Sequence, residues 1–210
     1  MRRDSFEDLK VYMRPMSVRE VLTEMKDICG LMIDLAYASV LLGDEDLANE
    51  VLELEREIDS LLYQLWMSAA IAVRDRTDAE AMAGIVKVAV AMDEISNAVS
   101  DITQIVVGKL GIHPAVKEVL EKIEPHYRRV IIKPNSYLVG KSIGELDLDI
   151  NLGIYVIAIR RKKELIIDPE DYVKFEPNDI VVVKGPLDCL NDFSMIASGQ
   201  IKDFKEVIED

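Results

Sequence analysis

The sequence predicts an α+β protein of two domains, an N-terminal antiparallel three-helix bundle followed by a small α/β domain. Up to about residue 125 the apolar residues recur every three to four positions, as on one face of a helix. Beyond it they alternate or form short runs, as in strands. The charge divides at the same point, with 13 basic and 24 acidic side chains before residue 126 and 12 and 15 after it. We therefore expect domains at residues 1–125 and 126–210.

Three long segments of the first domain carry the helical period, each as an alternation of three and four residues. The first has Val18, Val21, Met25, Ile28, Met32, Leu35, Ser39 and Leu42. The second has Leu47, Val51, Leu54, Ile58, Leu61, Leu65, Ser68 and Ala72. The third has Ile85, Val88, Met92, Ile95, Val99, Ile102 and Val106. The polar breaks between them are short, so successive helices must run antiparallel, and Asp44 and either Thr77 or Asp78 are the expected N-caps.

The rest of the chain reads as one short helix and then mostly strands. The helix is expected over Pro114 to Ile123, before Pro125. Strands are expected at 128–133, 154–159, 165–167 and 180–183. The sequence Glu176-Pro177-Asn178-Asp179 suits a type I turn, and a last helix is expected over Pro186 to Ile196.

Composition limits the partners. The formal charge of −14 argues against a nucleic-acid backbone or an anionic membrane surface as the main partner. The apolar run from Leu61 to Val73 is too short for a membrane-spanning helix, so no direct membrane insertion is expected and the protein should be cytoplasmic. Cys29 and Cys189 lie far apart and belong to no CxxC motif or Cys/His cluster, and we interpret both as reduced apolar residues.

The stretch Gly140-Lys141-Ser142 has the last three residues of a phosphate-binding P-loop. The first glycine that a P-loop needs is replaced by Asn135, and the following helix is expected to end at Leu146 or Leu148. We therefore expect Gly140 to serve a turn and Ser142 to cap a short helix.

Acidic residues repeat every fourth position on the second and third helices. They are Glu55 and Asp59, then Asp93, Asn97 and Asp101. Such spacing places the oxygens on one helix face, where they could hold a divalent cation or iron. The alternative interpretation is a solvated acidic face. An enzyme using these carboxylates is not expected, because no nucleophile or histidine can be tied to them.

The segments LELEREID (52–59) and AMDEISNAVSDI (91–102) resemble the paired acidic helix motifs of the PhoU family. The resemblance implies a three-helix bundle linked to phosphate-transport regulation, with metal held by Glu55, Asp59, Asp93, Asn97 and Asp101. Asn97 stands where that family usually has Asp, and an amide oxygen can also ligate. PhoU proteins carry two such bundles, so a homodimer is expected here. Its contacts would include Leu22, Cys29, Leu62 and Trp66, unless these belong to the core of one chain.

Residues 135–193 resemble the TrkA C-terminal domain, also known as the RCK C-terminal domain, of potassium channels and transporters. The matching positions are Ser136, Leu138, Val139, Gly140, Lys141, Ser142, Glu145, Leu146, Gly153, Val156, Ala158, Ile159, Arg160 and Pro169. The resemblance implies a small, nucleotide-type ligand at Arg160, Arg161, Ile166, Ile167 and Pro169. Because Arg161-Lys162-Lys163 lacks glycine, a hairpin wider than the family's is expected.

The two resemblances together imply a non-catalytic regulator of cation transport, with potassium as the expected ion and a membrane channel or transporter subunit as the partner. No GxGxxG segment is present, so NAD binding is not expected. The alternative is a PhoU-like, metal-binding regulator of phosphate transport or signalling.

Overall fold

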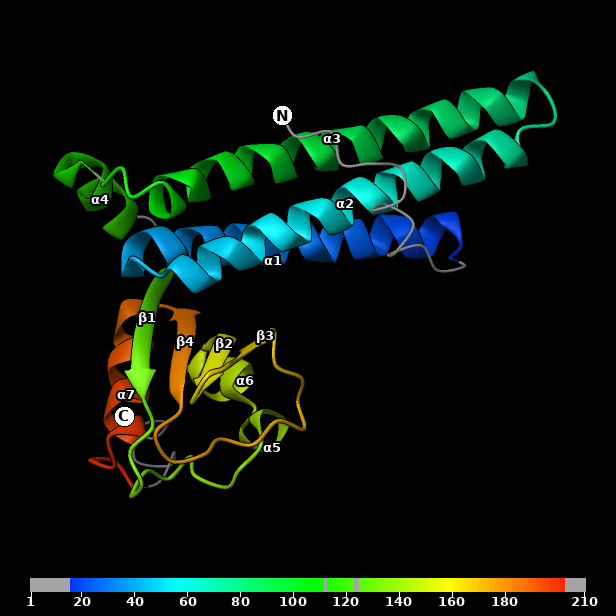
Figure 1. Cartoon of the computed structure of the whole chain (residues 1–210). Helices are drawn as coiled ribbons and strands as arrows, with labels where there is room; N and C mark the ends of the chain where they lie inside the picture. The colour runs from blue at the N-terminus through cyan, green and yellow to red at the C-terminus, as the bar shows by residue number, and fades with distance from the viewer. Residues whose placement is uncertain (1–15, 112, 123–124, 203–210) are drawn as a thin grey trace. The chain divides into compact units, whose positions relative to one another are not determined.

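The computed structural model describes residues 16–111, 113–122 and 125–202 (Figure 1). It divides into two compact units, residues 1–111 and 112–210, which are described separately below. The sequence prediction placed the boundary near residue 125. The segment between the two positions contains α4 (Pro114–Glu121), the short helix expected there. Its expected end at Ile123 lies outside the described residues.

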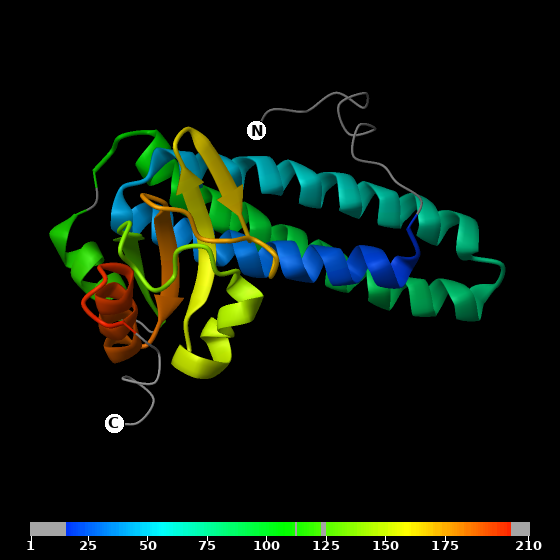
Figure 2. The same ribbon diagram turned by 90° about the horizontal axis from the view of Figure 1, so that it is seen from below.

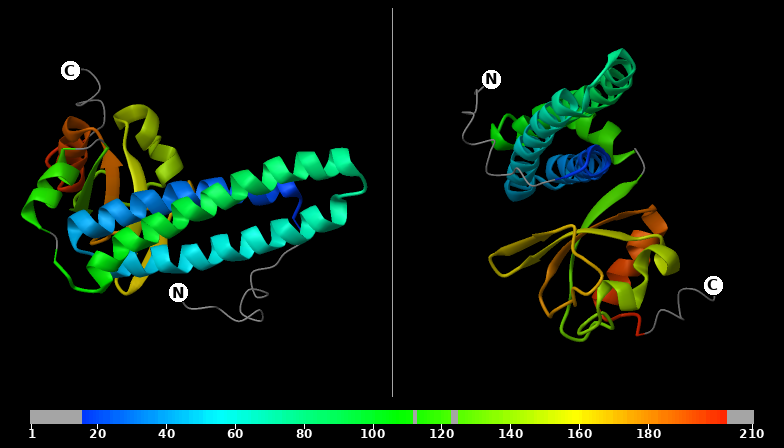
Figure 3. Two further views of the ribbon diagram at one scale, coloured as in Figure 1. Left: turned by 90° about the horizontal axis from the view of Figure 1, so that it is seen from above. Right: turned by 90° about the vertical axis from the view of Figure 1, so that its right-hand side faces the viewer.

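The first unit contains the three expected helices, α1 (Val18–Leu42), α2 (Glu45–Ala72) and α3 (Arg76–Val107). They lie side by side along their length (Figure 3). Ser17 caps α1 in a capping box, and Asp44 caps α2 as predicted. The predicted cap of α3 at Thr77 or Asp78 is wrong. The Asp75 carboxylate is the cap, because it accepts a hydrogen bond from the Asp78 amide at 2.9 Å.

The core of the bundle follows the predicted stripes on α1 and most of α2. The buried stripe residues are Val21, Met25, Ile28, Met32, Leu35, Ser39, Leu47, Val51, Ile58, Leu61 and Leu65. On α3 the predicted stripe is wrong at Val88, Ile95 and Ile102, which are exposed. The buried residues of α3 are smaller and more polar: Ala89, Ser96, Val99, Ser100 and Thr103. Small side chains on α3 can approach the large ones of α1 and α2 closely, which is why the apolar period alone misassigned this face.

The second unit is built on a four-stranded antiparallel sheet of order β1-β4-β2-β3. The strands are β1 (His126–Ile131), β2 (Tyr155–Arg161), β3 (Glu164–Ile167) and β4 (Ile180–Gly185). Beyond β1, the described residues of this unit also form α5 (Ile143–Leu146), α6 (Leu148–Leu152) and α7 (Leu187–Ala197). The sequence analysis predicted all of these elements except α6.

The helices pack on one face of this sheet (Figure 2). Side chains from all three helices share a core with that face: Leu146, Leu148, Leu152, Leu190, Phe193, Ile196, Val130, Ile159, Val181 and Val183. Successive residues of a strand point to opposite faces. The strand residues between these core positions therefore form the second face, called the outer face below.

Two turns differ from the sequence prediction. The β2–β3 hairpin is narrow, because Arg161 pairs with Glu164 across a two-residue turn. Lys162 takes a left-handed conformation there, with φ of 56°, and so replaces the missing glycine. The turn from Glu176 to Asp179 has Asn178 at φ of 71°, which marks a type II turn rather than type I.

Candidate functional site

The outer face of the sheet contains two parallel rows of residues, defined by the strand register. One row runs Leu165, Arg160, Ile180 and Ile131, and the next runs Ile167, Ala158, Val182 and Arg129. Arg160 and Arg129 thus lie diagonally on one apolar surface. Their strands β2 and β1 are separated by β4 and so lie about 10 Å apart, and the two guanidinium groups could engage different parts of one anionic ligand. The sequence analysis missed Arg129, because strand pairing alone brings β1 into this surface.

The register divides the predicted ligand-binding residues between the two faces of the sheet. Arg160 and Ile167 lie on the outer face. Arg161, which pairs with Glu164, and Ile166, which pairs with Ile159, lie on the helix-covered face. Ile166 packs against the core of the unit, and Pro169 is half-buried just after β3. The predicted set is thus divided between the two faces, and its contact with a ligand stays a prediction.

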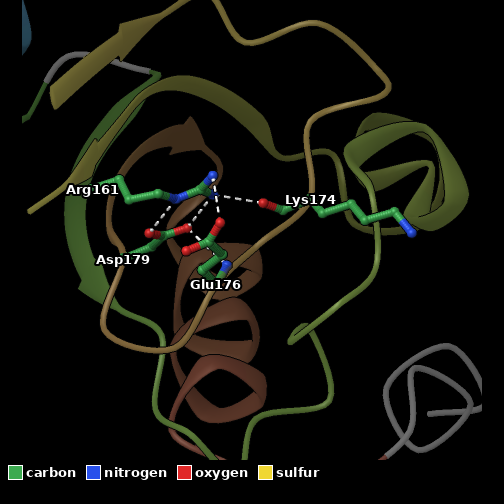
Figure 4. A network of polar contacts seen from close by, with 4 residues as sticks. All are labelled: Arg161, Lys174, Glu176 and Asp179. Atoms are coloured by element: carbon green, nitrogen blue, oxygen red, sulfur yellow. Dashed lines mark hydrogen bonds and ion pairs between the residues drawn. The ribbon is translucent and has the colours of Figure 1, made fainter.

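Arg161 makes a network of structural contacts (Figure 4). Its guanidinium bonds both oxygens of Asp179, at 3.0 and 2.8 Å, and the carbonyl of Lys174 at 2.6 Å. A third nitrogen lies 3.0 Å from the Glu176 carboxylate. The hydrogen bond to Asp179 raises the pKa of Arg161 above its ordinary value. This side chain joins the end of β2 to the turn before β4.

The Gly140-Lys141-Ser142 segment has the structure expected of a turn and helix cap. Gly140 has a φ of 82°, and Ser142 forms a capping box with Glu145 at the start of α5. The Lys141 ammonium lies 2.6 Å from the centre of the Tyr137 ring. A helix of four residues is too short for a P-loop arrangement, which needs a long helix.

The predicted metal ligands lie on two helices, Glu55 and Asp59 on α2 and Asp93, Asn97 and Asp101 on α3. Glu55 is half-buried and accepts a hydrogen bond from the Ser100 hydroxyl at 2.7 Å. Asn97 donates to the Asp93 carboxylate at 3.2 Å, so it is paired along its own helix. Asp59 and Asp101 are exposed.

Within the described ranges, no three His, Cys, Asp or Glu side chains come close enough to hold a metal ion. The arrangement does not fit a metal centre as it stands, and metal binding stays a prediction. Elemental analysis of wild type against Glu55→Gln/Asp59→Asn decides it, since equal metal content would leave a solvated acidic face.

Cys29 belongs to the interior of the bundle, where its thiol contacts the Met92 carbonyl at 3.5 Å. Burial, and then the charge of Asp93, raise the pKa of this thiol.

Of the other residues considered for a chain–chain contact, Leu22 and Leu62 are half-buried and Trp66 is 54% exposed. Among the described residues, no helix is both long and apolar enough to cross a membrane.

Two family models match the chain. The PhoU domain model matches residues 22–106, and the TrkA-C domain model matches residues 127–198. The Ktr system potassium uptake protein C of Bacillus subtilis (strain 168) is 35% identical over 78 residues, which are 37% of this chain and 35% of that protein. The chain thus matches about a third of the length of this relative.

Solved structures with similarity to the chain include two RCK C-terminal domains. One is the RCK_C domain dimer of S. agalactiae BusR in complex with c-di-AMP, with 24% identity and a TM-score of 0.34, covering 36% of this chain and 94% of that one. The other is the RCK C domain of the potassium transport protein KtrA in complex with the same nucleotide, with 33% identity and a TM-score of 0.32, covering 38% and 93%. The chain therefore contains a region that matches the PhoU domain, followed by a region that matches the TrkA-C domain.

Proposed function

We propose that this chain is a non-catalytic, cytoplasmic regulator of potassium transport, in which the TrkA-C domain binds a nucleotide-type ligand and acts on a membrane channel or transporter subunit. The observation that supports it most is the TrkA-C match over residues 127–198, together with the 35% identity to a potassium uptake protein. A homodimer belongs to the proposal, and a ligand that binds two states of this assembly with different affinities would shift the equilibrium between them.

The outer face of the sheet supplies the ligand site in this proposal. Arg160 and Arg129 provide two cations for phosphate oxygens, and the apolar side chains of Ile131 and Ile167 border them. A nucleotide carries both kinds of group, an anionic phosphate and an apolar base face. Arg161 has no direct role in the ligand contact, since Asp179 and Glu176 already engage it.

Titration calorimetry with c-di-AMP tests the ligand, because this is the nucleotide named in both RCK C-terminal structures. Arg160→Ala should weaken binding at least tenfold. Lys163→Ala removes an exposed cation from the adjacent turn and should leave binding unchanged. Equal affinity for wild type and Arg160→Ala would place the ligand elsewhere, and no binding of this or another nucleotide would remove ligand sensing from the proposal.

Deletion of the gene tests the transport process. Potassium uptake should change while phosphate control stays normal.

The second candidate is a PhoU-like regulator of phosphate transport or signalling, and the PhoU match over residues 22–106 favours it. The reverse outcome, altered phosphate control with normal potassium uptake, would support this second candidate and overturn the first.

A further inference from the structure

The outward side of α3 carries a continuous apolar stripe, called the α3 stripe below. Its members, in order, are Gly84, Val88, Ala91, Ile95, Ala98, Ile102 and Ile105. The three largest exposed members are Val88 (50% exposed), Ile95 (46%) and Ile102 (37%). Scattered exposed apolar residues need no explanation, but a row over four to five turns of one helix does.

The α3 stripe has the spacing of a coiled-coil seam, since its members alternate by four and three residues. Large and small residues also alternate along it. The β-branched residues Val88, Ile95 and Ile102 fall at one position of the heptad, and Gly84, Ala91 and Ala98 fall at the other, which ends at the larger Ile105. A facing helix with large residues opposite the small ones would fit this profile. The α3 stripe of a second chain, running in the opposite direction, would place its large residues opposite these small ones.

We propose that the α3 stripe is the contact surface for a second copy of this chain, with the two α3 helices antiparallel about a twofold axis near Asp93. In this register Ile95 lies opposite Ala91 of the partner subunit, and Val88 and Ile102 lie opposite small residues in the same way. A twofold contact makes each of these pairings occur twice. Parallel pairing would instead place large residues against large ones and leave gaps between the small ones.

The charges beside the α3 stripe support the antiparallel register. Lys87, Glu94 and Asp101 are exposed and occupy the heptad position that borders the stripe on the side away from the bundle core. The register brings Lys87 level with the oppositely charged Asp101 of the partner subunit, on both sides of the axis. Sliding the pair by one heptad would set Glu94 against that carboxylate in one direction, and would set Asp101 against Glu80 of the partner subunit in the other. In the proposed register, the like-charged contact is Glu94 with its own counterpart. This contact is independent of the ligand and of the ion transported.

Site-directed cross-linking in the full-length chain tests the contact, in a background with Cys29 and Cys189 changed to serine. A cysteine in place of Glu94 lies within one turn of its counterpart and should be joined by a short bis-maleimide. A cysteine in place of Glu80 lies about 40 Å from its counterpart in the antiparallel pair, at 1.5 Å per residue, and should stay unlinked. Linking of both would indicate parallel helices, and linking of neither would show that another segment or protein covers the stripe; either result overturns the proposal.

Two further variants separate this surface from a dimer contact elsewhere in the chain. Ile95→Lys in the Glu94→Cys background should reduce the cross-linked product at least tenfold. Ile71→Lys changes an isoleucine of α2 that is 85% exposed and outside the stripe, and should leave the yield unchanged. Lys87→Asp alone should also reduce the yield, and Lys87→Asp/Asp101→Lys should restore it. An unchanged yield in Ile95→Lys, or no restoration by the double variant, would overturn the surface or its register respectively.

Discussion

Arg161 and Asp179 form a two-point ion pair, with Nε 3.0 Å from Oδ1 and Nη2 2.8 Å from Oδ2. The Asp179 side chain is 1% exposed, so water cannot replace these contacts. Its Oδ2 also accepts the backbone N–H of Glu176 at 2.8 Å, which closes the turn before β4. Bidentate, charge-assisted pairs of this kind are among the stronger polar contacts in proteins.

Asp179→Ala should destabilise the TrkA-C domain by about 1.5–3 kcal/mol, because it removes the two-point acceptor of a partly buried guanidinium and the acceptor of a turn N–H. Glu176→Gln is the control, and should cost about 1 kcal/mol or less, since that carboxylate is 53% exposed. Urea unfolding followed by circular dichroism measures both. Trp66, the single tryptophan, lies in α2 and reports the bundle separately by fluorescence. A loss below about 1 kcal/mol for Asp179→Ala would show that the pair does not hold the domain together.

The sequence predicted the elements of both domains well because local patterns determine them. The stripe on α1 and the cap at Asp44 need only near neighbours. The faces of α3 were harder to predict, because two apolar rows lie side by side on that helix. Small residues such as Ala89 face the core, while larger ones such as Ile95 face outward.

The candidate ligand site was predicted only in part, for a related reason. Motif matching identified β2 and β3 as a unit, but strand register decides which residues share a face. Adjacent sequence positions such as Arg160 and Arg161 therefore separated, and Arg129 joined the surface from a strand distant in sequence.

The capping box of α5 should make stability depend on pH through Glu145. Its carboxylate accepts the Ser142 amide at 2.8 Å, and this hydrogen bond lowers the pKa of Glu145 below its ordinary value of 4.5. A lowered pKa in the folded state means that the unfolded state binds more protons, so stability is gained above the ordinary value and lost as the pH falls through the folded one.

Glu145→Ala should therefore be less stable than wild type at pH 7, and the difference should shrink as the pH falls from about 5 to about 3. Melting temperatures of both proteins across this range measure it. Asp171→Ala changes another exposed carboxylate of the same domain and serves as the control. A difference that stays constant with pH would indicate a packing effect rather than the titration of this group.

Cys29 and Cys189 should differ in reactivity toward a thiol reagent such as DTNB. Cys29 is 7% exposed and the pKa of its thiol is raised, both of which lower the concentration of accessible thiolate. Cys189 is only half-buried. At pH 8 the wild type should show one faster thiol and one slower by at least tenfold. The Cys189→Ser variant should lose the faster phase, and loss of the slower phase instead would reverse the assignment.

Ile166 and Ile167 provide a matched pair for separating the ligand surface from the core, because they are neighbours in β3 on opposite faces of the sheet. Ile166 packs against the core, so Ile166→Ala should lower the unfolding free energy of the domain by about 1–3 kcal/mol, less than a fully buried isoleucine would. Ile167→Ala should cost less stability and should weaken nucleotide binding several-fold, because its side chain shares the outer face with Arg160. Calorimetric titration and urea unfolding of both variants measure the two effects. If Ile166→Ala weakened binding at unchanged stability, the ligand would lie on the helix-covered face, and the two-arginine surface would not be its site.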